Sequence, residues 1–206
     1  MTPKKIRAGI IGCGSISRFH VHNIFQNKDT EIVALCDPFQ PSIDKLAMAF
    51  TMAGLEIPPN ESDINKFLHT FDLDAVVIAT PHALHHDHTL AALEAGVDVL
   101  LEKPMVVNTE EALSLIAARN QTQKTLVISF QGSLSPLIRL ASKGIKEGAY
   151  GELLSVSATV WQNWGEYTGG TWRHQPELSG GGFIFDTGAH MLNTVADVVN
   201  QDFIEV

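Results

Sequence analysis

Apolar and polar positions follow one repeating pattern over the first 130 residues. Short continuous apolar runs, which are typical of strands buried on both faces, alternate with segments in which apolar residues recur every three or four positions, as in amphipathic helices. The expected strands are Lys5–Ile11, Glu31–Cys36, Asp74–Thr80, Val97–Leu101 and Thr125–Phe130. The expected helices are Ser15–Phe25, Pro41–Met52, Asp63–His69, Asp87–Ala95 and residues 108–118. This alternation predicts an α/β fold with a doubly wound parallel sheet.

The pattern changes after Phe130. We expect a helix at Pro136–Lys146, a strand with one solvent-exposed face at Leu153–Trp161 and a long loop at Gln162–Gly182. A further helix is expected at Phe183–Val199 and another strand at Phe203–Val206. The sequence therefore predicts two domains, 1–130 and 131–206, with a more open sheet beginning in the second.

Composition narrows the possible partners. The formal net charge is −9, and no run of Lys or Arg follows Lys4-Lys5, so we expect neither nucleic acid nor a membrane surface as a partner. Hydrophobic residues make up 45% of the 206 residues, enough for a sizeable core. Cys13 and Cys36 do not form a disulfide framework, and no apolar stretch reaches the roughly 20 residues of a membrane span. We expect a cytoplasmic protein.

A glycine-rich turn separates the first strand from the first helix. In Gly12-Cys13-Gly14-Ser15-Ile16-Ser17, Gly12 permits a sharp turn and Gly14 lets the backbone approach a pyrophosphate, while Ser17 stands where a third glycine is usual. Asp37 ends the second strand near the usual spacing of about 20 residues. Its carboxylate would bind adenosine ribose hydroxyls and repel a 2′-phosphate, which favours NAD, with NADP possible. The expected cofactor contacts here are Gly12, Gly14, Ser15, Ile16 and Asp37.

Several short motifs, in order, resemble the Gfo/Idh/MocA oxidoreductase family. They are Gly12-Cys13-Gly14 with His20, Ala79-Thr80-Pro81 with His85, Ala95-Gly96, Glu102-Lys103-Pro104, Gly180-Gly181-Gly182 and Asp186-Thr187-Gly188-Ala189-His190. The resemblance implies a Rossmann domain followed by a domain with an open, mostly antiparallel sheet. It also implies hydride transfer between NAD(P) and a sugar, inositol or related polyol. A non-catalytic dinucleotide-binding sensor, and an NAD-dependent glycosidase of the same family, remain alternatives.

The sequence is shorter than typical members of that family. Family members typically run well beyond 300 residues, whereas this sequence has 206. We therefore expect a fragment, a truncated gene product, or a chain whose exposed sheet is covered by other chains. A complete chain is expected to form a homo-oligomer through the second-domain sheet.

The resemblance implies a catalytic set of Lys103, Asp186 and His190. Lys103 follows a core strand, where its charge can stabilise a developing alkoxide. Asp186 and His190 are four residues apart and share one face if helical. An imidazole with an ordinary pKa near 6.5 suits a general base around neutral pH, and Asp186 would orient it or bind a substrate hydroxyl. Helix capping and packing remain the structural alternatives for these two residues.

Other polar residues allow more than one interpretation. His82, His85, His86 and His88 suggest a metal, but no fuller ligand set accompanies them, and we expect none. Trp164, Trp172 and Arg173 either form a substrate wall or pack the long loop. The remaining expected cofactor contacts are Thr80, Pro81, His85, Glu102 and Lys103, and the expected substrate contacts are Lys103, Trp172, Arg173, Asp186 and His190.

Overall fold

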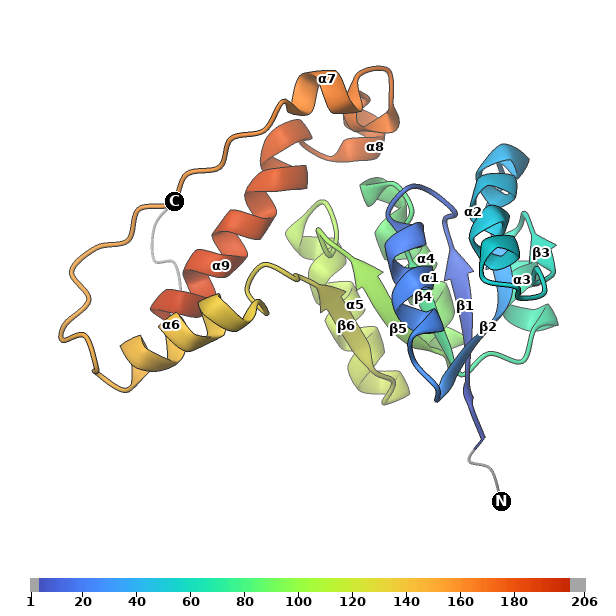
Figure 1. Ribbon diagram of the computed structural model, residues 1–206, viewed down its shortest axis with the longest axis horizontal. Coiled ribbons are helices and arrows are strands. Elements are labelled where there is room, and N and C mark those ends of the chain that lie inside the picture. The colour runs from blue at the N-terminus through green and yellow to red at the C-terminus, as the bar shows by residue number, and fades with distance from the viewer. Residues whose placement is uncertain (1–3, 201–206) are drawn as a thin grey trace. The chain divides into compact units, whose positions relative to one another are not determined.

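The computed structural model describes residues 4–200, which divide between Ile128 and Ser129 into two compact units. The first unit is built on a sheet covered by helices, whereas the second is built from helices joined by irregular segments (Figure 1). No helix within residues 4–200 is long and apolar enough to cross a lipid bilayer.

The first unit contains a six-stranded sheet in the order β3-β2-β1-β4-β5-β6. Its strands are β1 (Ile6–Ile11), β2 (Thr30–Cys36), β3 (Asn60–Glu61), β4 (Ala75–Ile78), β5 (Asp98–Glu102) and β6 (Leu126–Ser129). β1 pairs in parallel with β2 and β4, β2 pairs in parallel with β3, and β4 pairs in parallel with β5. This confirms the predicted Rossmann-type sheet and adds β3, which the sequence pattern did not indicate.

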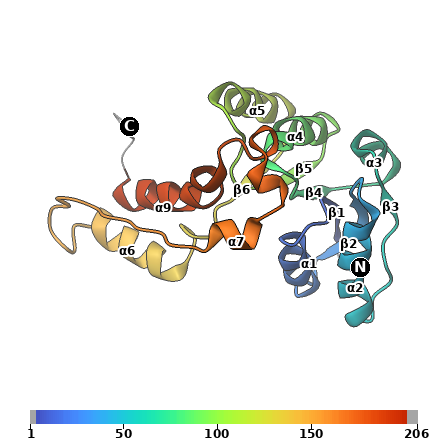
Figure 2. The same ribbon diagram turned by 90° about the horizontal axis from the view of Figure 1, so that it is seen from above.

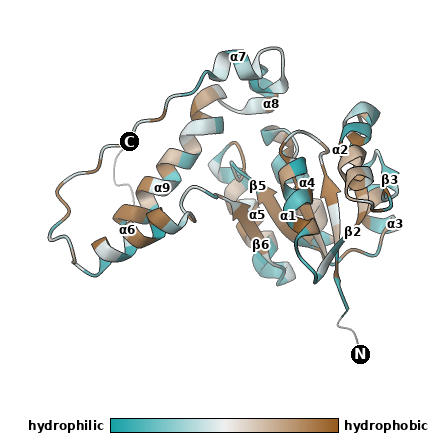
Figure 3. Cartoon of the chain, in the orientation of Figure 1, coloured by the Kyte–Doolittle hydropathy of each residue, from teal (hydrophilic) through white to brown (hydrophobic). Residues whose placement is uncertain are grey.

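Helices cover both faces of this sheet (Figure 2). α1 (Ser17–Phe25) and α2 (Gln40–Met52) lie on one face, and α3 (Ile64–Thr70), α4 (His85–Glu94) and α5 (Thr109–Thr122) on the other. Phe50 of α2 and Phe67 of α3 belong to two separate core clusters, one on each face. The strands between them are the most hydrophobic part of the unit (Figure 3), as expected for strands buried on both faces.

Local signals fix the ends of two helices as predicted. The Asn108 side chain accepts a hydrogen bond from the Glu111 backbone N–H at 2.9 Å, and the Glu111 carboxylate accepts from the Val107 N–H at 3.3 Å. This capping arrangement starts α5. Gly96 lies just beyond α4 with a φ of +78°, a conformation that glycine adopts without strain.

The second unit is organised around two helices that lie side by side, α6 (Pro136–Lys146) and α9 (Ala189–Val199) (Figure 1). A π-helical turn, η3 (Ile184–Gly188), leads directly into α9. Ser142 of α6 donates its hydroxyl proton to the Asp197 carbonyl of α9 at 3.1 Å. The predicted helices at Pro136–Lys146 and Phe183–Val199 are therefore present, the second with a wider first turn.

Two predictions for the second unit are wrong. Leu153–Trp161 forms no strand, because a strand needs a neighbouring strand for its backbone hydrogen bonds and none forms within residues 130–200. Gln162–Gly182 is not a structureless loop, since it contains α7 (Trp164–Thr168), the 3₁₀ turn η2 (Trp172–His174) and α8 (Pro176–Ser179). The strand predicted at Phe203–Val206 lies outside the described residues.

Candidate functional site

The carboxyl edge of the parallel sheet gathers most of the residues that the sequence singled out in the first unit. Gly12 follows β1, Asp37 follows β2, Thr80 follows β4 and Lys103 follows β5. Because these strands run parallel, their carboxyl ends meet at one edge. The strand order reverses between β1 and β4, and the crevice at such a switch point is where open α/β sheets bind ligands.

Gly12 and Gly14 make different contributions to the turn after β1. Gly12 has a φ of +87°, and a Cβ there would stand 2.6 Å from the Ala79 carbonyl oxygen, so only glycine fits. Gly14 is exposed, and a Cβ there would meet no protein atom within 4 Å. The first glycine therefore serves the fold, whereas the second leaves open space beside the backbone.

The N-cap residue of α1 makes no side-chain capping bond. That residue is Ile16, which has no side-chain oxygen, and the first turn of α1 holds no acidic residue. Uncapped N–H groups and the positive end of the helix dipole together favour an anion. Ser17 is fully buried and donates its hydroxyl to the Gly12 carbonyl, which gives this departure from the usual third glycine a structural reason. The turn thus fits a dinucleotide pyrophosphate.

Asp37 connects the end of β2 to the glycine turn. Its carboxylate accepts a hydrogen bond from the Cys13 N–H at 2.7 Å and from the Phe39 N–H at 2.9 Å. These bonds fix a negative charge beside the turn while the side chain stays partly exposed. A fixed carboxylate at this point can accept bonds from ribose hydroxyls and disfavours a phosphate in their place.

Glu102, the last residue of β5, is buried and paired with His20 of α1. The His20 Nε2 and Glu102 Oε1 atoms are 2.7 Å apart, and the other carboxylate oxygen accepts from the Lys103 N–H at 3.2 Å. Burial acts to raise the pKa of Glu102. The hydrogen bond to His20, the charge of the His20 ring and the hydrogen bond from the Lys103 N–H outweigh this effect and lower the pKa overall. The pair ties the helix after the glycine turn to the strand that carries Lys103. The motif included His20 and Glu102, but gave no sign of this pairing across 82 residues.

Three further expected residues lie between the end of β4 and the first residue of α4. Thr80 follows β4 and shares a hydrogen bond of 3.2 Å between its hydroxyl and the His88 Nδ1. Pro81 precedes the 3₁₀ turn η1 (His82–Leu84). His85 is fully buried, so its side chain reaches this edge only through the backbone groups that it contacts.

In the second unit, Asp186 is held by two side chains of the segment predicted as a loop. Its Oδ2 accepts from the Trp164 Nε1–H at 2.8 Å and from the Arg173 Nε–H at 3.0 Å. The Arg173 guanidinium also lies 4.5 Å from the centre of the Trp172 ring. Arg173 and Trp164 therefore hold the carboxylate in place. The sequence had left open whether these two residues form a substrate wall or pack the long loop.

His190 lies in the first turn of α9 and lines a cavity of about 440 Å³ within the second unit. Thr187, Gln162 and Gln131 add polar groups to the same cavity. The Thr187 hydroxyl donates to the Gln162 side-chain oxygen at 2.9 Å, and Phe130 packs edge-on against the His190 ring. The cavity therefore combines an imidazole with neutral hydrogen-bonding groups, which suits a hydroxyl-rich small molecule.

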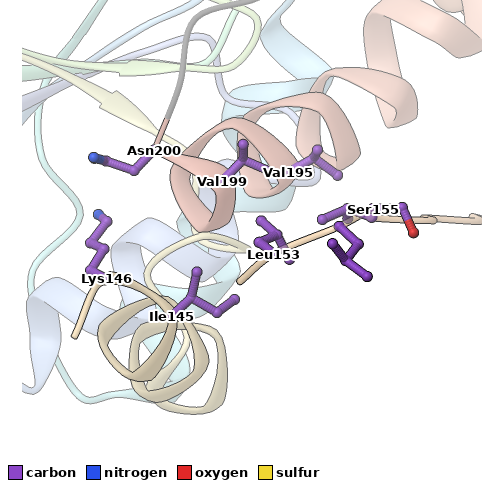
Figure 4. Close-up of a pocket in the computed structure, with 9 residues that line it drawn as sticks. Ile145, Lys146, Leu153, Ser155, Val195, Val199 and Asn200 are labelled. Atoms are coloured by element: carbon purple, nitrogen blue, oxygen red, sulfur yellow. The ribbon is translucent and has the colours of Figure 1, made fainter. Parts of the chain in front are cut away.

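A larger groove of about 600 Å³ lies between α6, α9 and residues 153–156 (Figure 4). Ile145, Leu153, Val195 and Val199 line it, and Lys146 is its only charged lining residue within residues 4–200. The groove lacks the paired acid and base that proton transfer needs, so it is not a candidate for the chemistry.

Neither the histidine cluster nor the cysteines form a reactive centre. Within residues 4–200, no three His, Cys, Asp or Glu side chains gather closely enough to hold a metal ion. His86 instead contacts Asp87 and the Ser114 hydroxyl. Burial raises the pKa of the Cys13 and Cys36 thiols to about 12, helped by the nearby charge of Asp37, so neither forms a thiolate near neutral pH.

Comparison with known proteins identifies the relatives of this chain. Residues 6–130 match the model of an oxidoreductase family with an NAD-binding Rossmann fold, and residues 138–206 match the Gfo/Idh/MocA C-terminal domain. D-Glucoside 3-dehydrogenase of Escherichia coli is 28% identical over 205 residues, which cover 97% of this chain and 55% of that protein. Levoglucosan dehydrogenase of Pseudarthrobacter phenanthrenivorans is 31% identical over 142 residues, 68% of this chain and 36% of that protein.

A solved structure has a similar fold. The WlbA dehydrogenase from Bordetella pertussis, in complex with NADH and UDP-GlcNAcA, matches with a TM-score of 0.84 and 28% identity. The match covers 97% of this chain and 58% of that one. The chain thus spans little more than half the length of these relatives. From the matched domains, the carboxyl-edge glycine turn and the ordered motifs, we conclude that the chain belongs to the Gfo/Idh/MocA oxidoreductase family.

Proposed function

We propose that this protein is an NAD-dependent oxidoreductase that transfers a hydride between the nicotinamide and a carbon–oxygen group of a sugar, inositol or related polyol. One observation carries the proposal: the glycine turn, the uncapped α1 and Asp37 occupy the same sheet edge as Glu102 and Lys103. The names of two matched relatives, which are dehydrogenases of a glucoside and of levoglucosan, support the substrate class.

The chain offers groups for each part of the dinucleotide. The Gly14 backbone and the first N–H groups of α1 would hold the pyrophosphate, since both are open to a ligand. Asp37 would bind the adenosine ribose, which makes NAD the preferred cofactor and leaves NADP as the weaker one. Thr80 and Pro81 would line the nicotinamide side of the crevice at the switch point.

The residues that we propose for catalysis are Lys103, Asp186 and His190. When bound, the nicotinamide accepts or returns the hydride. Lys103 would stabilise negative charge on the substrate oxygen, and His190 would take or give the hydroxyl proton. Asp186, already fixed by Trp164 and Arg173, would orient the imidazole or a second substrate hydroxyl. Each of these roles is a proposal for this chain.

Turnover assays separate this activity from its alternatives. With NAD⁺ and a panel of free sugars and inositols, we expect continuous NADH formation, and Lys103→Ala should depress turnover while NAD⁺ affinity stays nearly unchanged. Release of an aglycone from glycosides without net NADH would instead identify a glycosidase. Binding of NAD⁺ with neither reaction would point to a sensor and contradict the proposal.

A further inference from the structure

His85 is the first residue of α4, and its ring is fully buried between two backbone carbonyl groups. The Nδ1 atom lies 2.7 Å from the Pro104 oxygen, and the Nε2 atom lies 3.0 Å from the Thr80 oxygen. The ring therefore connects the residue that follows β4 to the turn that follows β5. Both of those positions belong to the candidate cofactor edge.

Carbonyl oxygens only accept hydrogen bonds, so each ring nitrogen would need a proton to satisfy both contacts. A neutral imidazole carries one N–H, whereas the cation carries two. Burial lowers the pKa of His85 below its ordinary value, against the opposing effect of the two carbonyl groups, and this favours the neutral ring. A neutral ring must donate to one carbonyl and present a lone pair to the other.

The two contacts differ in length and in whether the residue that supplies the carbonyl is anchored in another way. The Pro104 contact is the shorter, and Pro104 has no backbone N–H with which to anchor the turn itself. The Thr80 residue is already held through its hydroxyl contact with His88. We propose that His85 is a positioning residue whose Nδ1–H, donated to the Pro104 carbonyl, fixes the turn that carries Lys103; this role rests on the proposed function.

The burial of the ring separates this role from direct cofactor binding. A side chain with 0% exposure offers no atom to a ligand in the crevice, whereas the turn that it holds carries the partly exposed Lys103. Catalysis is sensitive to such support, because a small misplacement of a reacting group lowers the rate strongly. We therefore expect loss of the bond to lower turnover far more than NAD⁺ affinity.

Nuclear magnetic resonance of the full chain without cofactor tests the bond directly. Long-range proton–nitrogen correlation of the histidine rings, with the His85 signals assigned by their disappearance in the His85→Asn variant, reports which nitrogen carries the proton. We expect a neutral ring protonated at Nδ1 at pH 7. A ring protonated only at Nε2 would overturn the proposal, because Nδ1 would then have no proton to donate to the Pro104 carbonyl, and this result does not depend on any activity.

Two substitutions at His85 distinguish the contribution of the Nδ1 bond from that of the Nε2 bond. The amide nitrogen of Asn can occupy the position of Nδ1 and that of Gln the position of Nε2, while both remove the ring. We expect His85→Asn to keep turnover within about threefold of the unaltered protein and His85→Gln to lose at least about tenfold, with NAD⁺ affinity little changed in both. His86→Asn, one residue along α4, is the matched control and should leave turnover unchanged.

The remaining outcomes are decisive as well. If His85→Asn and His85→Gln both retain turnover, the ring only fills space. If both lose it equally, the whole ring is needed. Either result would overturn the proposal. A reversed order would assign the essential bond to Thr80. If the unaltered chain binds no NAD⁺, the proposed function fails, and the protonation state of His85 in the cofactor-free protein still decides whether the bond to Pro104 exists.

Discussion

At the scale of single residues, two carboxylates at the sheet edge are held in place by hydrogen bonds within the protein. Asp37 accepts two backbone N–H bonds, and Glu102 is held by His20 and by the Lys103 N–H. Preorganised charges of this kind need no rearrangement when a ligand binds. The contact between His20 and Glu102 therefore contributes to stability as well as to the site.

The Glu102 contact predicts a pH-dependent contribution to stability. Because the pKa of Glu102 is lowered in the folded protein, its contribution is present above the ordinary value of 4.5 and is lost as the pH falls through the folded-state pKa. Glu102→Gln should lower the free energy of unfolding by about 2 kcal/mol at pH 6, and the difference should shrink below pH 4.5.

Urea unfolding of both proteins between pH 3 and 6 measures this difference. Glu94→Gln, at an exposed residue of the same unit, is the control and should stay within about 0.5 kcal/mol of the unaltered protein. A deficit in Glu102→Gln that does not change with pH would contradict the assigned role of the carboxylate charge.

At the scale of elements, the glycine turn and α1 are continuous in sequence, and their two glycines have different roles. The positive φ of Gly12 and its closeness to the Ala79 carbonyl serve the fold. We propose that Gly14 and the uncapped end of α1 hold the ligand, because a Cβ at Gly14 would meet no atom of residues 4–200 within 4 Å. Substitutions at the two glycines should therefore have different effects.

Gly12→Ala should lower the free energy of unfolding by about 1–3 kcal/mol, through strain at φ +87° and the clash with Ala79. Gly14→Ala should change it by less than about 0.5 kcal/mol, since its backbone is outside the positive-φ region and its surroundings are open. The same Gly14 variant should weaken NAD⁺ binding by at least about tenfold. Thermal unfolding and calorimetric titration measure the two effects. Unchanged NAD⁺ affinity in Gly14→Ala would remove the pyrophosphate from this turn.

The elements that the sequence predicted well are those whose signals are local. Asn108 with Glu111 marked the start of α5, Gly96 marked the end of α4, and Pro136 opened α6 at the expected residue. The alternation at Leu153–Trp161 misled, because strand formation depends on a partner that the segment itself does not encode. The short helices after it depend on contacts such as Trp164 stacked on His174, which no local pattern reveals.

The same distinction applies to the site. Glycine spacing and the acid after β2 predicted the turn and Asp37, because parallel strands bring such positions to one edge. The pairing of His20 with Glu102 and the burial of His85 between two carbonyl groups depend on packing between distant elements. The hydrogen bond from Arg173, in the segment predicted as a loop, to Asp186, in the predicted helix, joins residues 13 apart in sequence, so it could not be inferred from helical spacing.

At the scale of the whole molecule, the chain combines a six-stranded Rossmann-type unit with a helical unit that matches a Gfo/Idh/MocA C-terminal domain. The residues proposed to bind the cofactor belong to the first unit, and Asp186 and His190 belong to the second. Our account of the function therefore depends first on the first unit binding the dinucleotide. The proposed substrate chemistry would then use Lys103, Asp186 and His190.

Calorimetric titration of the full chain with NAD⁺ and NADP⁺ tests that central requirement most directly. We predict one saturable site per chain that binds NAD⁺ more tightly than NADP⁺, and a preference that falls at least about tenfold in Asp37→Ala, because the carboxylate that discriminates between the riboses is gone. Absence of saturable binding of either dinucleotide to the folded chain would contradict the account.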